Sequence, residues 1–429
     1  NDATRGRAHA LFEMLEGKIS QDGWHDEGVK DALDLCLSCK GCKGDCPVNV
    51  DMATYKAEFL SHYWEGKVRP RHAYAFGFID KWAQLASLAP GFVNLFTQLP
   101  IVREVAKATA GIPHQRSIPA FAAQTFKSWF KEHKPSANAS GKRVILWPDT
   151  FNNHFFPETA IAAMEVLEAA GCNVIVPSAH MCCGRPLYDY GFLDAAKAYL
   201  TRIMDLLGPE IDKGTPIVVL EPSCCSVFCD ELTNLFPTLP RARKLKENTF
   251  TFSGFLEKQA DFDVPSLKKK AVVHSHCHHK AVMRMKDEEA LFKKMGLDYE
   301  MLDSGCCGMA GSFGFESDKY DVSLKIGERV LLPAVRRTAP STLVVADGFS
   351  CKEQIAQLTN RDALHPAEVL ALAMRNPDIA HSDFPEKQIV GARKKAQQRS
   401  MLNAGLVTAT AIAAGIFLAL ARKETDNSK

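Results

Sequence analysis

The feature that most constrains this chain is a run of four closely spaced cysteines, Cys36, Cys39, Cys42 and Cys46, with Pro47 directly after the last. This spacing is typical of a short loop whose thiolates surround a cubane iron–sulfur cluster. A zinc site normally uses two separated pairs of ligands, so three cysteines at every third position favour iron over zinc or coincidence. We therefore predict a [4Fe–4S] site on these four cysteines.

The fourth cysteine of the run leaves two arrangements open. In proteins with two such clusters, the last cysteine of each run binds the other cluster. Only one complete run is present, so Cys46 either closes its own cluster or pairs with a second run upstream of Asn1. Because the sequence does not begin with methionine, we expect the second arrangement, in which this chain is a piece of something longer.

Length and composition exclude several classes of protein. The chain has 429 residues and 14 cysteines, and at this length a hydrophobic core does not need disulfides. It is 46% hydrophobic and 24% charged, which is typical of a globular protein. A formal net charge of +2 gives no excess of basic residues for nucleic-acid binding. Residues 1–17 show no secretory signal, so we expect the cysteines in a reducing compartment, on the cytoplasmic side.

Most of the other cysteines lie in two segments with the same order of strands, helices and cysteine pairs. Cys307 follows Cys183 by 124 residues, and Cys351 follows Cys224 by 127, which indicates a duplication. The corresponding pairs are both followed by glycine, as Cys182-Cys183-Gly184 and Cys306-Cys307-Gly308. The alternation of strands and helices predicts βαβ units with parallel sheets.

The second of these Cys-Cys-Gly modules supplies four thiols, Cys277, Cys306, Cys307 and Cys351, each placed at a strand end or tight turn. Ligands of open α/β sheets bind at that edge, and adjacent cysteines make poor disulfide partners, so we predict a second iron–sulfur cluster. We expect Gly308 to let the backbone approach it closely. A zinc site and a solvated loop without a role are the alternatives. The neighbouring histidines would help bind zinc or donate to cluster sulfurs: His274, His276, His278 and His279.

The first module lacks one cysteine of the pattern, because a step of 127 residues back from Cys277 reaches Thr150. It keeps Cys182, Cys183 and Cys224, with Cys225 and Cys229 as spares. We expect a degenerate module without metal, and a further cluster on Cys182, Cys183 and Cys224 is the alternative. We interpret Arg185 as part of a surface salt bridge rather than as an anion site, and Cys172 as a small buried apolar residue.

The expected fold is mixed α and α/β. We divide the chain into a helical ferredoxin-type domain, a helical connector, the first and second Cys-Cys-Gly modules, and a tail, at residues 1–65, 66–142, 143–262, 263–376 and 377–429. We expect the connector to form short helices that wrap the core; a docking surface for a partner is the alternative. The tail holds twenty uncharged residues, 402–421, which is long enough for a membrane anchor; a helix buried at an interface is the alternative.

Together these motifs make the chain resemble the iron–sulfur part of FAD-linked 2-hydroxyacid dehydrogenases. Its Cys-Cys-Gly modules are also similar to those found in iron–sulfur subunits of glycolate oxidase, anaerobic glycerol-3-phosphate dehydrogenase and heterodisulfide reductase. The resemblance covers about residues 4 to 375 and is carried by these segments: Thr4-Arg5-Gly6-Arg7-Ala8, residues 34–42, residues 50–60, Trp147-Pro148-Asp149, residues 304–308 and Gly348-Phe349-Ser350-Cys351.

The resemblance implies a protein that passes electrons from FAD through [4Fe–4S] clusters to a quinone or other carrier. The substrate would be a D-2-hydroxyacid of the D-lactate, D-2-hydroxyglutarate or glycolate type. FAD and the substrate site would lie on an absent portion or partner chain. The sequence has no complete G-x-G-x-x-G loop, and we expect no catalytic residue here. The alternatives are a reductase with direct chemistry at a Cys-Cys-Gly cluster and a zinc-binding structural protein. Thr150 and the tail beyond about residue 376 depart from the family pattern.

Overall fold

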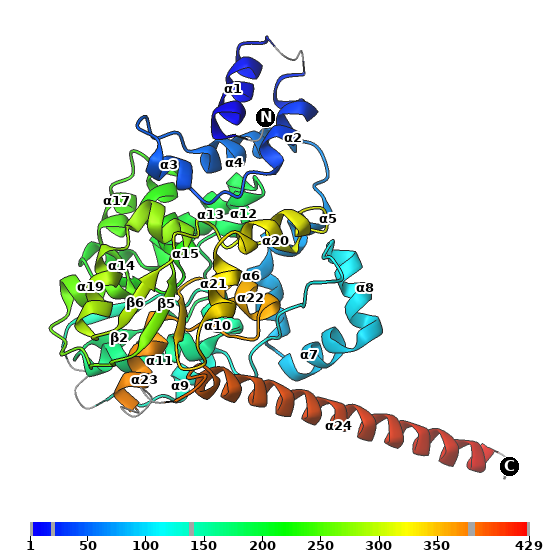
Figure 1. Cartoon of the computed structure of the whole chain (residues 1–429). Helices are drawn as coiled ribbons and strands as arrows, with labels where there is room; N and C mark the ends of the chain where they lie inside the picture. Colours follow the sequence, from blue (N-terminus) through cyan, green and yellow to red (C-terminus); the bar gives the residue numbers. More distant parts are fainter. Residues whose placement is uncertain (1–2, 19–21, 137–140, 376–381, 427–429) are drawn as a thin grey trace.

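A computed structural model describes residues 3–18, 22–136, 141–375 and 382–426 of the chain, with side chains described up to residue 411 in the last range. A helical unit sits at one end of a larger α/β body, and a long C-terminal helix runs along the opposite end (Figure 1). The mixed α and α/β class predicted from the sequence is confirmed. The division into five segments stays a prediction.

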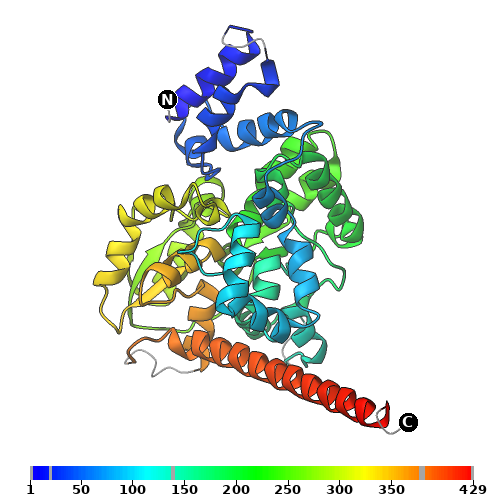
Figure 2. The same cartoon turned by 90° about the vertical axis from the view of Figure 1, so that its right-hand side faces the viewer.

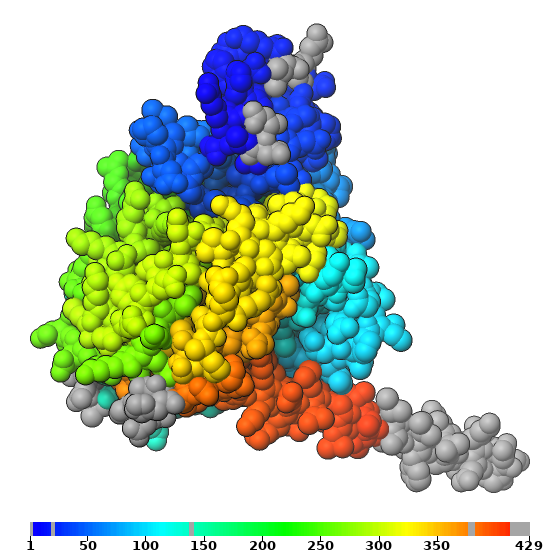
Figure 3. Space-filling view, viewed as in Figure 1, coloured from blue at the N-terminus to red at the C-terminus, as the bar shows by residue number. Residues whose placement is uncertain are grey.

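The N-terminal unit is built from four helices, α1 (Thr4–Leu15), α2 (Glu27–Asp34), α3 (Gly41–Asp45) and α4 (Met52–Tyr63), with a short 3-10 turn at Gly23–His25. The Asp26 carboxylate accepts the Val29 N–H at the start of α2, and Asp51 accepts the Thr54 N–H at the start of α4. These helices share a small core around Leu33 and Phe59. The unit forms a separate lobe on the body (Figure 3).

The connector consists of short helices, as predicted: α5 (Arg71–Gly77), α6 (Ile79–Ala86), α7 (Pro90–Gln98), α8 (Pro100–Ala110) and α9 (Phe126–Glu132). Two of them begin with proline, which lacks a backbone N–H and fits the first helical position. Large apolar side chains stay exposed on α6 and α8, among them Trp82, Leu85 and Ile101. The connector therefore wraps the body without burying all of its own apolar surface.

The first module carries a four-stranded parallel sheet in the order β2-β1-β3-β4. Its strands are β1 (Arg143–Leu146), β2 (Asn173–Ile175), β3 (Ile217–Val219) and β4 (Thr249–Thr251). Its helices are α10 (Thr150–His154), α11 (Pro157–Ala169), α12 (Arg185–Asp189), α13 (Leu193–Leu206), α14 (Gly208–Asp212), α15 (Pro222–Ser226), a π-helical turn (Val227–Glu231), α16 (Leu232–Leu235), α17 (Pro240–Glu247) and α18 (Phe252–Gln259).

The second module repeats this arrangement with a three-stranded parallel sheet in the order β6-β5-β7. Its strands are β5 (Lys270–His274), β6 (Asp298–Met301) and β7 (Leu343–Ala346). Its helical segments are a π-helical turn (His279–Met283), α19 (Lys286–Lys294), a 3-10 turn (Phe313–Phe315), α20 (Tyr320–Glu328), α21 (Leu331–Arg337), α22 (Phe349–Leu358) and α23 (Pro366–Arg375). In both sheets the first strand lies between the second and the third.

The long helix α24 (Lys387–Asp426) crosses the base of the body and extends past it (Figure 2). It packs against α7, where a Cβ on Gly91 would lie 2.5 Å from the Ser400 carbonyl oxygen, so only glycine permits this approach. Among the described residues, no helix is both long and apolar enough to cross a bilayer. The predicted anchor at 402–421 is therefore not supported, and the side chains of its second half, 412–421, lie outside the described part.

The two modules share one hydrophobic core, in which Leu146 and Val218 of the first lie in the same cluster as Val273 and Val345 of the second. A buried polar contact crosses the same boundary. The Lys352 ammonium of α22 lies 3.0 Å from the Glu368 carboxylate of α23 and 3.2 Å from the Thr159 hydroxyl of α11. Burial opposes ionisation of Glu368, but Lys352 and the His365 N–H outweigh it and hold its pKa below the usual value.

We expect Lys352→Met to destabilise the protein by about 3–5 kcal/mol, because it leaves the Glu368 carboxylate buried without its cation. Urea unfolding of the variant and the parent chain measures the difference. The double variant Lys352→Met with Glu368→Gln removes the charge and keeps an acceptor, so it should recover most of the loss. A single variant as stable as the parent would contradict this role for the pair.

Candidate metal centres

The first candidate centre is the loop between α2 and α4 that carries the four closely spaced cysteines. Ser38 and Lys40 both adopt positive φ angles of 51° and 59°, which turn the chain sharply on either side of Cys39. Burial and the nearby Cys277 thiol raise the pKa of Cys39 to about 12, and Cys36 and Cys42 add to the rise. Three thiols of the run therefore lie close enough to repel one another as thiolates, a donor set that fits an iron–sulfur cluster.

Cys46 differs from the other three. The backbone N–H groups of Val50, Val48 and Asn49 lower the pKa of its thiol, with no other cysteine among the causes. Its side chain is partly buried, as are those of Cys39 and Cys42, whereas Cys36 is buried. The backbone N–H groups around its sulfur atom are therefore what distinguishes Cys46.

The second centre lies where the strands of the second module end. Cys277 follows β5, Cys306 and Cys307 follow β6, and Cys351 lies in α22 directly after β7. The ligand atoms of His274, Cys307 and Cys351 all lie within 4.8 Å of one another. The neighbouring thiols of Cys277 and Cys307, together with burial, raise the pKa of Cys306. The four predicted cysteines therefore meet in one place, and one imidazole joins them.

The four histidines of this region have separate positions. The His274 Nδ1 atom lies 2.7 Å from the Ser304 hydroxyl, while its Nε2 atom is buried with no hydrogen-bond partner among the described residues. His279 is 2.6 Å from the Asp347 carboxylate and 3.3 Å from Glu288, away from the cysteines. The His278 Nε2 atom bonds to the Ser38 carbonyl oxygen, and His276 and His278 both line a cavity. Of the four, His274 has a ring nitrogen within 4.8 Å of the Cys307 and Cys351 sulfur atoms and fits the predicted role of a donor beside the cysteines.

Gly308, which follows Cys306 and Cys307, is required by a tertiary contact. It has φ 92°, and a Cβ on it would lie 2.2 Å from the backbone oxygen of Ser323 in α20. Glycine is needed here because α20 packs directly on this backbone. The expectation that Gly308 also lets the backbone approach a cluster closely stays a prediction.

The first module brings three of its cysteines together. The sulfur atoms of Cys183 and Cys224 are 3.0 Å apart, and Cys182 lies against Cys183. The hydrogen bond to Cys183, followed by burial, raises the pKa of Cys182. The thiol hydrogen bond to Cys183 lowers the pKa of Cys224, but burial outweighs it and leaves the pKa above its ordinary value. The two spares, Cys225 and Cys229, form a separate pair 4.0 Å apart.

Cys172 is buried in the hydrophobic core, as predicted for a small apolar residue.

The interpretation of Arg185 as part of a surface salt bridge is wrong. Its side chain is buried, lies 3.0 Å from the Asp189 carboxylate, contacts Glu231, and donates to the Ser38 carbonyl oxygen at 3.0 Å. Glu231 is 46 residues and Ser38 is 147 residues away from Arg185 in the sequence. The sequence alone therefore did not indicate that the Arg185 guanidinium is buried.

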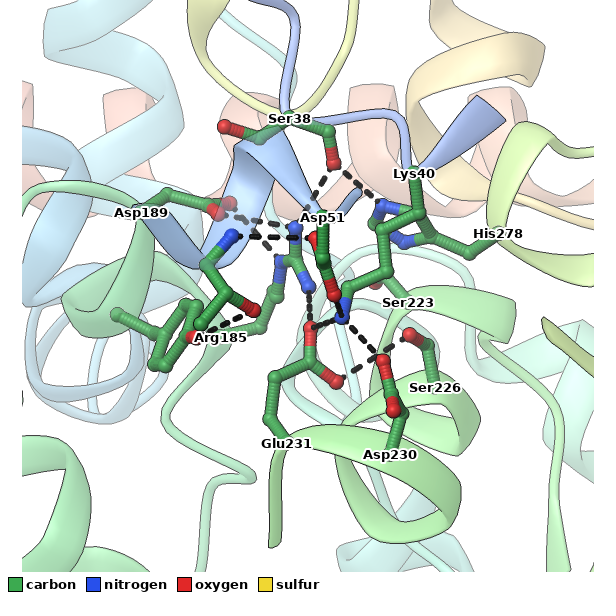
Figure 4. Close-up of polar contacts among 12 residues, drawn as sticks. Ser38, Lys40, Asp51, Arg185, Asp189, Ser223, Ser226, Asp230, Glu231 and His278 are labelled. Carbon is green, nitrogen blue, oxygen red and sulfur yellow. Dashed lines mark hydrogen bonds and ion pairs between the residues drawn. The ribbon is translucent and has the colours of Figure 1, made fainter. Parts of the chain in front are cut away.

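Lys40 is the functional residue that sequence reasoning missed. Its ammonium is completely buried, 3.1 Å from Asp51 and 2.9 Å from Glu231, and it also contacts Asp230 (Figure 4). Burial disfavours its charge, but these carboxylates outweigh that effect and raise its pKa. Lysines between cysteines are common on exposed loops, and nothing in the sequence marks this one as enclosed.

The Ser38 carbonyl oxygen joins three parts of the chain. It accepts one hydrogen bond from Arg185 of the first module and one from the His278 Nε2 atom of the second, at 2.9 Å (Figure 4). Cys39 follows Ser38 directly, and Cys277 precedes His278. This geometry places the cysteine loop against both modules and brings it beside Cys277.

A cavity of about 750 Å³ lies between the connector, the cysteine loop and the two modules. Its wall is largely apolar and aromatic, with Trp82 and Phe349 among its members. Thiols of both modules also line it: Cys182, Cys183, Cys224 and Cys277. Arg185, His276 and His278 are the basic side chains near them. A small molecule in this cavity would therefore meet the cysteines of both modules.

Comparison with known proteins agrees with this architecture. A family model described as a cysteine-rich domain matches the chain twice, at residues 150–228 and 271–356. A subunit of anaerobic glycerol-3-phosphate dehydrogenase from Escherichia coli (strain K12) is 30% identical over 290 residues, which are 66% of this chain and 72% of that protein. D-2-hydroxyglutarate dehydrogenase of the same strain is 25% identical over 371 residues, 82% of this chain but 36% of that protein. Lactate utilization protein A of Bacillus subtilis is 27% identical over 242 residues, 53% of this chain and 98% of that protein.

We expect Lys40→Met to loosen the cysteine loop, because among the described residues Asp51 and Asp230 then keep only the partly exposed Lys43 as a cationic partner, and Glu231 keeps only Arg185. Hydrogen–deuterium exchange of residues 27–63 should become faster while the sheets keep their protection. Lys30→Met is the matched control, because Lys30 lies in the same unit in a more accessible pair with Glu27 and should change exchange little. Equal exchange in both variants would refute the role assigned to Lys40.

Proposed function

Since the chain belongs to the same family as this anaerobic glycerol-3-phosphate dehydrogenase component and is the iron–sulfur portion of a hydroxyacid dehydrogenase, we propose that it is the electron-transfer module of a FAD-dependent D-2-hydroxyacid dehydrogenase. The carrying observation is that the cysteine loop meets the second module where the Ser38 carbonyl oxygen accepts a hydrogen bond from His278. The neighbouring Cys39 and Cys277 pack against the same hydrophobic cluster. Two redox groups held there would lie side by side. Catalytic acid–base residues are not required on this chain.

The residues that would hold [4Fe–4S] clusters are Cys36, Cys39, Cys42 and Cys46 in the loop, and Cys277, Cys306, Cys307 and Cys351 in the second module. Bound clusters would supply one-electron transfer between a flavin and an acceptor. The protein contributes position and electrostatics. Backbone N–H groups of Met52 and Lys43 point at Cys42, and the His274 imidazole faces Cys307, so both centres carry donors that stabilise thiolate charge.

The substrate class follows from the extent of the similarity. The match to D-2-hydroxyglutarate dehydrogenase covers 82% of this chain, against 66% for the glycerol-3-phosphate dehydrogenase component. This favours a D-2-hydroxyacid, of the D-lactate, D-2-hydroxyglutarate or glycolate type. FAD and the substrate site belong to a partner chain or portion in this proposal. The largely apolar and aromatic cavity supports a quinone as the acceptor, because such walls suit a planar apolar molecule.

Two other functions remain as outcomes of the tests. Thiols of both modules line the cavity, which favours direct reduction of a disulfide or other substrate there as the second candidate. The close group of His274, Cys307 and Cys351 would also suit a structural zinc ion.

We expect anaerobically purified protein to contain iron and acid-labile sulfide, with about four irons lost in Cys39→Ser and about four lost in Cys307→Ser. Each variant removes a thiolate from one predicted centre. Cys172→Ser is the matched control, because Cys172 is buried in the apolar core and should leave the iron content unchanged. Metal analysis and low-temperature EPR measure the result. Stoichiometric zinc without sulfide would support the structural alternative and overturn the proposal.

The cavity makes a second prediction. Ala106 of α8 lines it, whereas Ala108 of the same helix is exposed and does not. After reduction with dithionite, reoxidation by the quinone menadione should be about tenfold slower in Ala106→Trp, the equivalent of about 1.4 kcal/mol of lost binding. Ala108→Trp should match the parent. Stopped-flow absorbance follows the reaction, and identical rates in all three proteins would place the acceptor outside the cavity.

A further inference from the structure

Thr150 occupies in the first module the place that Cys277 occupies in the second. Each follows the central strand of its sheet, β1 or β5, and each is 127 residues from the other in sequence. The other ligand positions correspond in the same way: a cysteine pair follows β2 or β6, and Cys224 after β3 takes the place of Cys351 after β7. The first module therefore has the same order of ligand positions along the chain, with a hydroxyl in place of one thiol.

The Thr150 side chain is held in place and unsatisfied. Asp149 accepts the N–H groups of Phe151 and Asn152, which fixes the start of α10 and with it Thr150. The residue is 6% exposed, and its Oγ1 atom has no hydrogen-bond partner among the described residues. A buried hydroxyl without a partner is unfavourable, so a bound group that supplied a partner would stabilise this site.

Thr150 and the three thiols of its module line the same cavity. Cys182, Cys183 and Cys224 line the cavity together with Thr150, whereas the spares Cys225 and Cys229 do not. The sulfur atoms of Cys183 and Cys224 are 3.0 Å apart, so these two thiols and the Thr150 hydroxyl face the same space.

We propose that the first module holds a [4Fe–4S] cluster through Cys182, Cys183 and Cys224, and that Thr150 leaves the fourth iron open toward the cavity for an anionic sulfur or oxygen donor of a small molecule. The second module closes its own fourth position with Cys277. Metal sites that carry chemistry keep an open position, whereas closed sites serve structure or electron transfer. The inference rests on the proposed function for the identity of the metal, and it changes the expectation of a metal-free first module.

The test uses the anaerobically reconstituted full chain oxidised with ferricyanide. A [4Fe–4S]2+ cluster with an open iron gives one electron to ferricyanide, releases one Fe2+ and remains as [3Fe–4S]+. The first module of the parent chain should contribute about one released Fe2+ and one [3Fe–4S] EPR signal. Thr150→Cys should release about one Fe2+ fewer than the parent and lose the corresponding part of the signal, because a fourth thiolate retains the iron. Thr150→Ser is the matched control and should behave like the parent.

Two further variants test which module gives the [3Fe–4S] EPR signal. Cys183→Ser should lose about four irons together with the [3Fe–4S] signal, while Cys277→Thr should create a second open site and about double the signal. The thiol 2-mercaptoethanol should shift the EPR spectrum of the reduced parent and leave that of Thr150→Cys unchanged. Far-UV circular dichroism confirms that each variant is folded.

Full iron content in Cys183→Ser, or an unchanged signal in Thr150→Cys, would overturn the inference. This failure is distinct from failure of the proposed function, because the loop and the second module are counted independently through Cys39→Ser and Cys307→Ser.

Discussion

The buried ammonium of Lys40 is the interaction on which the arrangement of the centres depends. A cation taken out of water needs anions around it, and here three carboxylates supply them: Asp51 at the start of α4, and Asp230 and Glu231 in the first module. The ion pairs with these carboxylates hold the sharp turn of the loop at Lys40. The loop is thereby pressed against the modules, and the adjacent Cys39 cannot move independently of them.

The same contact explains why one carbonyl group serves both modules. With Lys40 held by Glu231, the neighbouring Ser38 oxygen meets Arg185, which itself contacts Glu231. From the other side it accepts the His278 N–H. Charge neutralisation and hydrogen bonding thus act on one short segment, Ser38 to Lys40. They connect the predicted electron carrier of the loop to Cys277 without any direct contribution from the sheets.

The sequence predicted features that depend on neighbouring residues, but not contacts between residues far apart in the chain. Spacing identified the cysteines, and the alternation of strands and helices placed them at the strand ends, because parallel strands finish at one edge. It did not reveal that Arg185 and Lys40 are enclosed, since their partners are up to 190 residues away. Nor did it separate His274 from His279, because a cluster of histidines in sequence does not show which ring faces a thiol. Gly308 was identified as special, but the packing of α20 that requires it is a tertiary contact.

Duplication gives the molecule two similar cysteine sites, and the two sites differ in whether their thiols line the cavity. The second module places its cysteines beside Cys39, and three of them, Cys306, Cys307 and Cys351, are buried, apart from the cavity wall. The first module turns its three thiols and Thr150 into the cavity instead. Cys277 belongs to both environments, because it lies near Cys39 and also lines the cavity. Under the proposed function, a carrier at the second module would therefore lie between the loop and the cavity, and electrons that entered at the loop would have a short route to a molecule bound in the cavity.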